Sequence, residues 1–230
     1  MLMKKWNELP KEFQTAEIKQ YYDILAKRTA ALIIKRSFDI IMSLLLLLIL
    51  SPVFLVIAVM IKAETKGAVF YRQKRITQYG KSFRIYKFRT MIVNADQLGT
   101  LVTLQGDERI TKTGKRIRKC RLDELPQLIN VLKGEMTFVG TRPEVEKYVE
   151  AYSDAMKATL LLPAGITSLA SIRYKDEDEI LAKYPQNVDE AYINIVLSEK
   201  MKYNLEYLIQ FSIWQDLKLC FLTIAAVLYK

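Results

Sequence analysis

The chain has no histidine among its 230 residues, and this absence removes several kinds of chemistry. Serine and cysteine nucleophiles that depend on a histidine base are excluded, and so is every metal site that needs an imidazole ligand. An acid, a base or a nucleophile in this protein must therefore be a carboxylate, a lysine, a tyrosine, a hydroxyl or a thiol.

Cysteine is nearly as scarce, because the chain contains only Cys120 and Cys220. The two lie far apart in unlike sequence surroundings, so neither a disulfide framework nor a zinc site is expected. The sequence also lacks a P-loop, a dinucleotide-binding glycine motif and a protein-kinase signature. The scarcity of cysteine favours a chain whose main part faces a reducing cytoplasm.

Positive charge and apolar residues are what the chain has in quantity. Lys and Arg number 35 against 25 Asp and Glu, which gives a net charge of +10, and 51% of the residues are hydrophobic. This composition suits one domain with a real core plus a segment of another kind. We expect the cations to bind phosphate groups and anionic lipids, and we do not expect nucleic acid as a partner.

The additional segment is the uncharged run "IIMSLLLLLILSPVFLVIAVMI", from Ile40 to Ile61. As a helix it would extend roughly 33 Å, about the thickness of the hydrocarbon core of a bilayer. It begins too late and runs too long for a cleavable signal peptide, and no small-residue cleavage site follows it. The sequence therefore predicts a membrane protein.

The topology of this run is predicted from its flanks and its midpoint. Basic residues lie on both sides, in 27–36 and in 62–75, so both ends are expected on the cytoplasmic face. Pro52 removes a backbone donor from the middle of the run, and Ser51 can bond a freed carbonyl. These residues favour a re-entrant helix-break-helix at Ser51-Pro52, with a kinked straight span as the alternative.

The remaining patterns predict an α+β fold that is predominantly α-helical. Residues 1–34 are expected to form an amphipathic helical segment, 35–66 the re-entrant helix of a monotopic membrane protein, and 67–230 the cytoplasmic catalytic domain. The amphipathic segment would lie on the membrane surface or on the domain. Within the domain, "AVFYRQK" and "SFRIYKF" around a glycine-containing turn predict a small β-hairpin.

The C-terminal stretch "YLIQFSIWQDLKLCFLTIAAVLY" is strongly apolar but carries two charges, Asp216 and Lys218. Those charges argue against a second membrane span. They predict a helix half-sunk in the membrane interface, with Trp214 and Tyr229 as anchors.

The stretch "KCRLDELPQL" places two carboxylates, Asp123 and Glu124, directly behind a run of cations that contains no acid. Two interpretations need no catalysis. Asp123 would cap a helix, and the cations would bind anionic lipid headgroups. Neither interpretation explains why the two features are adjacent, so we also consider an active site.

Helical spacing predicts one helix from Glu124 to Lys133 and another that begins near Pro143, with Thr141 as its cap. Helix N-termini bind phosphate, so two that converge would form an anion site around Asp123. Nearby cations would hold Asp123 ionised and lower its pKa, which favours a nucleophile or a metal ligand. Glu124 could bind Mg²⁺ or take up a proton.

The complete order of motifs resembles the bacterial sugar transferase family. The motifs are "KRSFDI", an apolar run broken by "SP", "FYRQKRI", "FRIYKFRTM", "RLDELPQLINVLKGEMTFVGTRP", "PAGIT" and "SIWQDLKL". These proteins are monotopic phosphoglycosyl transferases. The resemblance implies Mg²⁺-dependent transfer of a sugar-1-phosphate from a nucleotide diphosphate sugar, with a UDP-sugar expected, to undecaprenyl phosphate. A nucleoside monophosphate is released, and the phosphosugar is held covalently on an aspartate in between.

The resemblance also assigns roles to residues of this chain. The catalytic Asp-Glu dyad, which is also the expected Mg²⁺ site, matches Asp123 and Glu124. The phosphate-contacting basic positions match Lys87, Arg118 and Arg142.

Other matched positions concern the membrane and the donor. The membrane break matches Ser51 and Pro52. Asn204 stands where relatives often carry a donor-binding aspartate, so it is a weak nucleotide- or sugar-binding candidate, and Thr141 replaces a usual proline. The implied location is the cytoplasmic face of the bacterial inner membrane, with membrane lipids as partners. The implied role is the first membrane step of exopolysaccharide, capsule or other glycoconjugate synthesis.

Two alternative functions remain open at this point. "DED" at Asp176 to Asp178 fits the Asp-x-Asp pattern of metal-dependent glycosyltransferases, which makes Asp176 and Asp178 candidate ligands. A non-catalytic adaptor whose basic face binds anionic lipid would also explain the charge. The sequence does not indicate the sugar or the oligomeric state.

Overall fold

A computed structural model describes residues 3–95, 107–174, 177–184 and 186–228. The longer helices are α1 (Ala16–Ala26), α2 (Thr29–Ile49), α3 (Ser51–Glu64), α4 (Lys112–Lys119), α5 (Gln127–Lys133), α11 (Ser198–Gln210) and α12 (Ile213–Leu228). The short α-helices are α6 (Glu146–Val149), α7 (Asp154–Lys157), α8 (Leu169–Arg173), α9 (Glu177–Leu181) and α10 (Val188–Ala191). Single turns are η1 (Trp6–Glu8), η2 (Lys11–Phe13), η3 (Gln78–Gly80), η5 (Leu122–Glu124) and η6 (Ala158–Leu161), and η7 (Tyr192–Leu197) is a π-helix.

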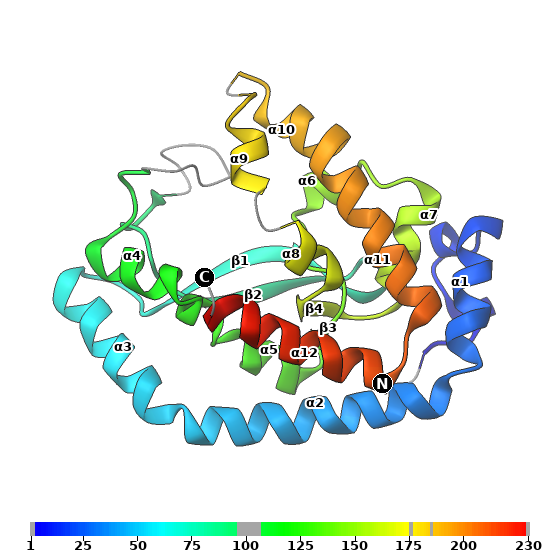
Figure 1. Ribbon diagram of the computed structural model, residues 1–230, viewed down its shortest axis with the longest axis horizontal. Helices are drawn as coiled ribbons and strands as arrows, with labels where there is room; N and C mark the ends of the chain where they lie inside the picture. Colours follow the sequence, from blue (N-terminus) through cyan, green and yellow to red (C-terminus); the bar gives the residue numbers. More distant parts are fainter. Residues whose placement is uncertain (1–2, 96–106, 175–176, 185, 229–230) are drawn as a thin grey trace.

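The described residues form a mostly helical fold, as the sequence predicts, around two small sheets, of which the sequence predicts only the hairpin. β1 (Phe70–Ile76) and β2 (Ser82–Phe88) are antiparallel, and β3 (Met136–Val139) and β4 (Ala164–Thr167) are parallel. Figure 1 shows the strands at the centre, with α2 along one long edge, α3 bending away from its end, and α12 lying between α2 and the strands.

The N-terminal segment packs on the domain. Ile18 and Leu25 of α1 and Leu32 at the start of α2 are almost completely buried, in the same apolar cluster as residues of α11 and α12. Of the two placements that the sequence left open, the structure therefore supports packing on the domain. The predicted boundary at residue 35 does not match a break in the chain, because α2 already begins at Thr29.

The apolar run is broken where the sequence predicts. α2 ends at Ile49, α3 begins at Ser51 with Pro52 in its first turn, and the two axes differ by 60°. The hydroxyl of Ser51 donates to the Leu48 carbonyl at 2.8 Å. Among the described helices, none is by itself both long and apolar enough to cross a bilayer, although the bent pair meets both requirements when taken together.

The start of α2 is fixed to the domain by charged groups. Lys35 is buried and donates to the Val139 carbonyl at 2.8 Å and to Asp216 Oδ2 at 2.5 Å. Arg36 donates to the carbonyls of Val131 and Leu132 at the end of α5, at 2.6 and 2.9 Å. The long apolar helix is therefore held firmly at its polar end.

The C-terminal apolar stretch forms two helices rather than one, because α11 ends at Gln210 and α12 begins at Ile213. Asp216 is turned inward to Lys35, while Trp214 is exposed on the outer face of α12. The charge that argues against a second span is thus part of a buried network. Tyr229, the other predicted anchor, lies outside the described residues.

Candidate active site

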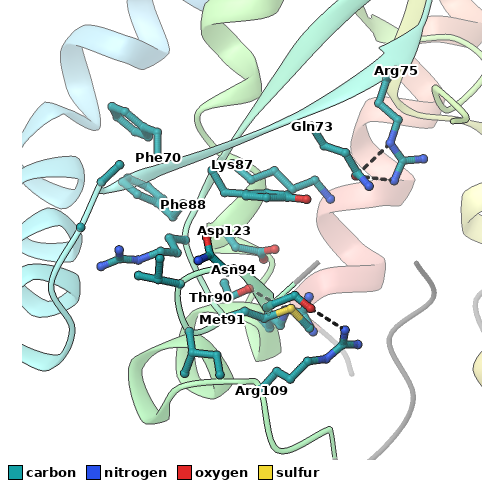
Figure 2. A pocket seen from close by; sticks show the side chains of 18 residues that line it. Phe70, Gln73, Arg75, Lys87, Phe88, Thr90, Met91, Asn94, Arg109 and Asp123 are labelled. Carbon is teal, nitrogen blue, oxygen red and sulfur yellow. Dashed lines mark hydrogen bonds between the residues drawn. The ribbon is translucent and has the colours of Figure 1, made fainter. Parts of the chain in front are cut away.

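A cavity of about 360 Å³ lies beside the central hairpin, and Asp123 is part of its wall (Figure 2). Its lining comes from β1, β2, the segment that follows β2, and the α4–η5 region. The charged residues among the described lining are one carboxylate and five cations, namely Asp123 with Arg75, Lys87, Arg89, Arg109 and Arg118. This excess of cations favours an anionic ligand, although Arg75, Lys87 and Arg109 also pair with carboxylates outside the lining.

Asp123 lies in the 3₁₀ turn η5, which follows the left-handed residue Arg121 with φ of 54°. Its carboxylate is buried, and its Oδ1 has no hydrogen-bond partner among the described residues. The helix that follows begins only at Gln127, with Pro126 at its N-cap. The helix-cap interpretation of Asp123 is therefore wrong.

The pKa of Asp123 is raised, contrary to the sequence-based expectation. Burial disfavours the ionised carboxylate most, and the neighbouring charge of Glu124 adds to this effect. Lys87, Arg118 and Arg121 favour ionisation but do not outweigh burial. Counting the nearby cations overestimated their effect because it left out the loss of water around the carboxylate.

Glu124 has the opposite environment. Its Oε1 accepts a hydrogen bond from Lys87 Nζ at 3.0 Å, and Arg142 binds both of its oxygens, Nη1 reaching Oε2 at 3.3 Å and Nη2 bonding Oε1. Burial opposes the charged form, but Arg142 and Lys87 outweigh it and hold the pKa of Glu124 well below its usual range. Burial lowers the pKa of Lys87 in turn. Glu124 is thus an ionised and firmly held carboxylate.

The helix predicted to begin near Pro143 is short and begins three residues later. α6 begins at Glu146, and residues 141–145 are extended. Their backbone carbonyls are used in tertiary bonds: Ile76 N–H donates to Glu144 O at 3.0 Å, and Arg75 Nη1 donates to Pro143 O at 3.1 Å. The prediction that two helix N-termini converge on the dyad is therefore wrong, and Arg142 reaches Glu124 from an extended segment.

Arg118 is positioned by the packing of α4. Gly114 lies very close to the segment that follows β2. A Cβ added to Gly114 would stand 2.1 Å from the Thr90 carbonyl oxygen. Glu64 at the end of α3 accepts hydrogen bonds from the first two amides of α4, at 2.7 and 2.8 Å. Arg118 Nε then donates to Thr90 Oγ1 at 3.1 Å. Arg118 lines the cavity with Asp123, and its phosphate-binding role stays a prediction.

Several lining residues were missed by the sequence reasoning. Gln73 and Arg75 lie on the same face of β1 as Tyr71, and Tyr71 is the register partner of Lys87. Every second residue of a strand lies on the same face, so the sequence "FYRQKRI" already contained the information that Gln73 and Arg75 share a face with Tyr71. Arg109 also lines the cavity and pairs with Asp107, with Nη2 and Oδ2 2.6 Å apart.

One known protein family matches most of the chain. The family model described as bacterial sugar transferase matches residues 30–230. The chain belongs to the bacterial sugar transferase family. The resemblance read from the motifs is thereby confirmed, and the dyad segment lies inside the matched region.

Named relatives of this family cover most of the chain. It is 35% identical over 198 residues to UDP-N-acetylgalactosamine-undecaprenyl-phosphate N-acetylgalactosaminephosphotransferase of Aeromonas hydrophila. This match covers 85% of this chain and 44% of the relative. It is 38% identical over 197 residues to UDP-glucose:undecaprenyl-phosphate glucose-1-phosphate transferase of Klebsiella pneumoniae. This match covers 84% of this chain and 40% of the relative. It is 34% identical over 208 residues to the exopolysaccharide production protein ExoY of Sinorhizobium fredii, with 84% of each covered. The chain therefore spans less than half of the first two relatives and most of the third.

Not every residue that the resemblance assigned lies at the cavity. Arg142 is not among the described lining residues, and its contact is with Glu124. Asn204 is buried on α11, where its amide nitrogen lies 3.7 Å from Met201 Sδ, so its donor-binding role stays a prediction. Asp176 and the side chain of Asp178 lie outside the described residues, which leaves the glycosyltransferase alternative without structural support.

The fit of the site to Mg²⁺ depends on Asp123. The part of the chain that the structure describes contains no cluster of three or more metal-binding side chains, so it offers no complete protein cage. Mg²⁺, however, commonly takes one or two carboxylates and completes its shell with water and substrate phosphates. The unpartnered Oδ1 of Asp123 suits that mode, whereas the oxygens of Glu124 are already held by cations.

Proposed function

We propose that this protein transfers a sugar-1-phosphate from a UDP-sugar to undecaprenyl phosphate, with Asp123 as the nucleophile. The observation that carries the proposal is the unpartnered carboxylate oxygen of Asp123, buried in the wall of a cation-rich cavity. The printed names of the relatives include UDP-sugar donors and undecaprenyl-phosphate acceptors, which supports the two substrates.

The transfer takes place in two displacements at one phosphorus atom. A carboxylate oxygen of Asp123 attacks the phosphorus that bears the sugar, and the bond from that phosphorus to the bridging oxygen of the diphosphate breaks. UMP leaves with the electron pair. A phosphate oxygen of undecaprenyl phosphate then attacks the same phosphorus, and the Asp123 carboxylate leaves. The products are UMP and undecaprenyl diphosphate sugar, and neither step needs a net proton transfer.

The surrounding cations make an attack by one anion on another feasible. Phosphoryl transfer depends mainly on positioning and on stabilising the negative charge of the phosphoryl oxygens. Lys87 and Arg118 line the cavity with Asp123 and are placed to neutralise that charge. Glu124, bound to Lys87 and Arg142, fixes the positions of both cations. When bound, Mg²⁺ would be held by Asp123 and would add charge neutralisation at the diphosphate.

The proposal places α2 and α3 in the cytoplasmic leaflet of the inner membrane as a re-entrant helix pair, with the cavity facing the cytoplasm. The 60° bend at Ser51 and the many exposed apolar side chains of both helices support it. A water-soluble donor and a lipid acceptor must meet at this depth. The reaction would be the first membrane step of exopolysaccharide or capsule synthesis.

The released nucleotide tests the reaction. The purified protein is incubated with Mg²⁺, polyprenyl phosphate and a panel of radiolabelled UDP-sugars, and the nucleotides are separated. We expect UMP from at least one donor. UDP as the only nucleotide product would overturn the proposal, and a lipid-binding adaptor would release neither.

The topology is tested by labelling from one side of sealed vesicles. Single cysteines are placed before Lys35 and after Lys66 in a variant without native cysteines. We expect both to react with a membrane-impermeant maleimide from the same side. Reaction from opposite sides would contradict the re-entrant arrangement.

A further inference from the structure

The cavity has two chemically different ends. Figure 2 shows Phe70 and Phe88 on one side of Lys87 and Asp123, and Gln73 with Arg75 on the other. Gln73 Oε1 accepts hydrogen bonds from Arg75 Nε and Nη2 at 3.1 and 2.8 Å, so that end is polar and ordered. At the opposite end the two phenyl rings are stacked, with centroids 5.5 Å apart.

The apolar end is open rather than part of a sealed core. Phe70 is 37% exposed, and Phe88 behind it is only 1% exposed, so Phe70 is the ring that meets the cavity opening. Two other apolar lining residues, Ile92 and Val93, are 41% and 53% exposed. Arg89 lies at this end, but its terminal nitrogens donate to the Thr65 and Lys66 carbonyls and to Thr65 Oγ1 at 2.7–2.9 Å. Its guanidinium therefore holds Thr65 and Lys66, the two residues that follow α3, and does not cover the apolar side chains of the cavity wall.

The apolar end continues onto the helix that carries the exposed apolar surface. Phe88 packs against Phe54 of α3 with ring centroids 5.1 Å apart, and it shares a buried cluster with Ile57 and Ile61 of the same helix. Other apolar side chains of α3 are exposed, Leu55 to 67%. The apolar end of the cavity is thus packed directly against the helix that carries exposed apolar side chains.

We propose that the exposed apolar side chains of the cavity wall, Phe70, Ile92 and Val93, with buried Phe88 supporting Phe70, bind the first isoprenoid units of the polyprenyl phosphate acceptor. This inference rests on the proposed function. The acceptor joins a phosphate directly to an apolar chain, so its site needs cations beside an apolar wall, and Lys87 and Arg118 lie next to this one. A nucleotide sugar is polar over most of its surface, and the end with Gln73 and Arg75 remains for it.

The test measures the Michaelis constants of the two substrates separately, by UMP release in detergent micelles. Phe70→Ser removes the aromatic wall, and the double variant Ile92→Ser/Val93→Ser removes the aliphatic part from exposed positions that folding tolerates. Each is expected to raise KM for polyprenyl phosphate about tenfold, while KM for the UDP-sugar changes less than about twofold. Gln73→Ala is expected to show the reverse pattern.

The matched control is Ile209→Ser on α11. Ile209 is 47% exposed, more than Phe70, and lies neither on α3 nor among the described residues that line the cavity, so both KM values should stay at the wild-type level. An unchanged acceptor KM in both wall variants would overturn the inference, and so would a rise confined to the donor KM. Wild-type protein that releases no UMP would instead refute the proposed function, and the two failures are thereby distinguished.

Discussion

Asp123 and Glu124 are neighbours in the chain but have opposite electrostatic surroundings. Glu124 accepts hydrogen bonds from Lys87 and Arg142, whereas Asp123 Oδ1 accepts none from the residues that the structure describes. Burial raises the pKa of Asp123, while Arg142 and Lys87 overcome burial and lower that of Glu124. One carboxylate is thus held in place by protein cations, and the other keeps a buried oxygen without a hydrogen-bond partner among the described residues.

Replacement of Asp123 by Asn should abolish turnover without lowering stability. Loss of the nucleophile is expected to cost a factor of roughly 10³ or more in kcat. A carboxyl group with a raised folded-state pKa stabilises the fold only at low pH, and this contribution is lost as the pH rises through that pKa. At neutral pH the ionised group is unfavourable, so Asp123→Asn should have an equal or higher Tm in chelator without substrate.

The control for this stability effect is Asp189→Asn. Hydrogen bonds from Lys147 and Tyr148 lower the pKa of Asp189, so its replacement should reduce Tm at neutral pH. Full activity in Asp123→Asn would refute its role as nucleophile. A large drop in the Tm of Asp123→Asn would contradict the conclusion that the buried carboxylate of Asp123 lacks a stabilising partner.

Glu124→Gln should lower both activity and stability. It leaves two partly buried cations without a charged partner, which costs about 2 kcal/mol in the free energy of unfolding. Because the folded-state pKa of Glu124 is depressed, the advantage of the wild type should be full above about pH 4.5 and shrink as the pH falls below that value. Denaturant unfolding at several pH values measures the difference.

The exposed ion pair between Lys74 and Glu146 provides the control for Glu124→Gln. Glu146→Gln should change the unfolding free energy by less than about 1 kcal/mol, because water screens the pair. Equal effects of the two variants would show that the pairing of Glu124 is unimportant.

Lys35→Met should loosen the attachment of α2. Lys35 is the cation beside buried Asp216, which also accepts a hydrogen bond from Tyr207 at 2.7 Å, so its removal leaves a buried charge and costs about 3 kcal/mol. The double variant Lys35→Met/Asp216→Leu should recover part of this loss, since Asp216 no longer stands as an unpaired charge, while buried Asp39, which Lys35 also stabilises, keeps its hydrogen bonds from Thr137 and the Phe138 N–H. Thermal unfolding in one detergent compares them, and a double variant less stable than the single one would contradict the account.

The two cysteines should react with a maleimide at very different rates. Cys120 is exposed, whereas burial and nearby Asp216 raise the pKa of Cys220 to about 11. Native protein near pH 7 should therefore take up one label quickly, at Cys120, and a second only after denaturation. Peptide mapping identifies the site, and fast labelling of Cys220 would show that α12 is packed differently.

Local patterns predicted the parts of the fold that depend on local chemistry. The hairpin follows from strand alternation around a turn, and the break in the apolar run follows from Pro52. The clustering of Lys87 and Arg118 with the dyad came from the family resemblance, and the structure places both at the cavity with Asp123.

The failed predictions depended on tertiary contacts. Residues 141–145 stay extended because β1 and β4 use their carbonyl oxygens, including a bond from Gly165 N–H to Thr141 O at 2.8 Å. The parallel pairing of β3 and β4 was missed for a similar reason. Its close approach requires Gly140 and Gly165, since a Cβ on Gly165 would lie 2.2 Å from Gly140 N. Such a contact between distant segments cannot be predicted from a local sequence pattern.

The intact mass of the protein after incubation with donor and Mg²⁺, without acceptor, tests the central claim most directly. We predict a mass gain equal to one sugar phosphate, located on the peptide that contains Asp123, absent in Asp123→Asn, and removed when polyprenyl phosphate is added. UMP release that requires the acceptor, with no gain in mass at any stage, would contradict the account, as would a modification on Glu124.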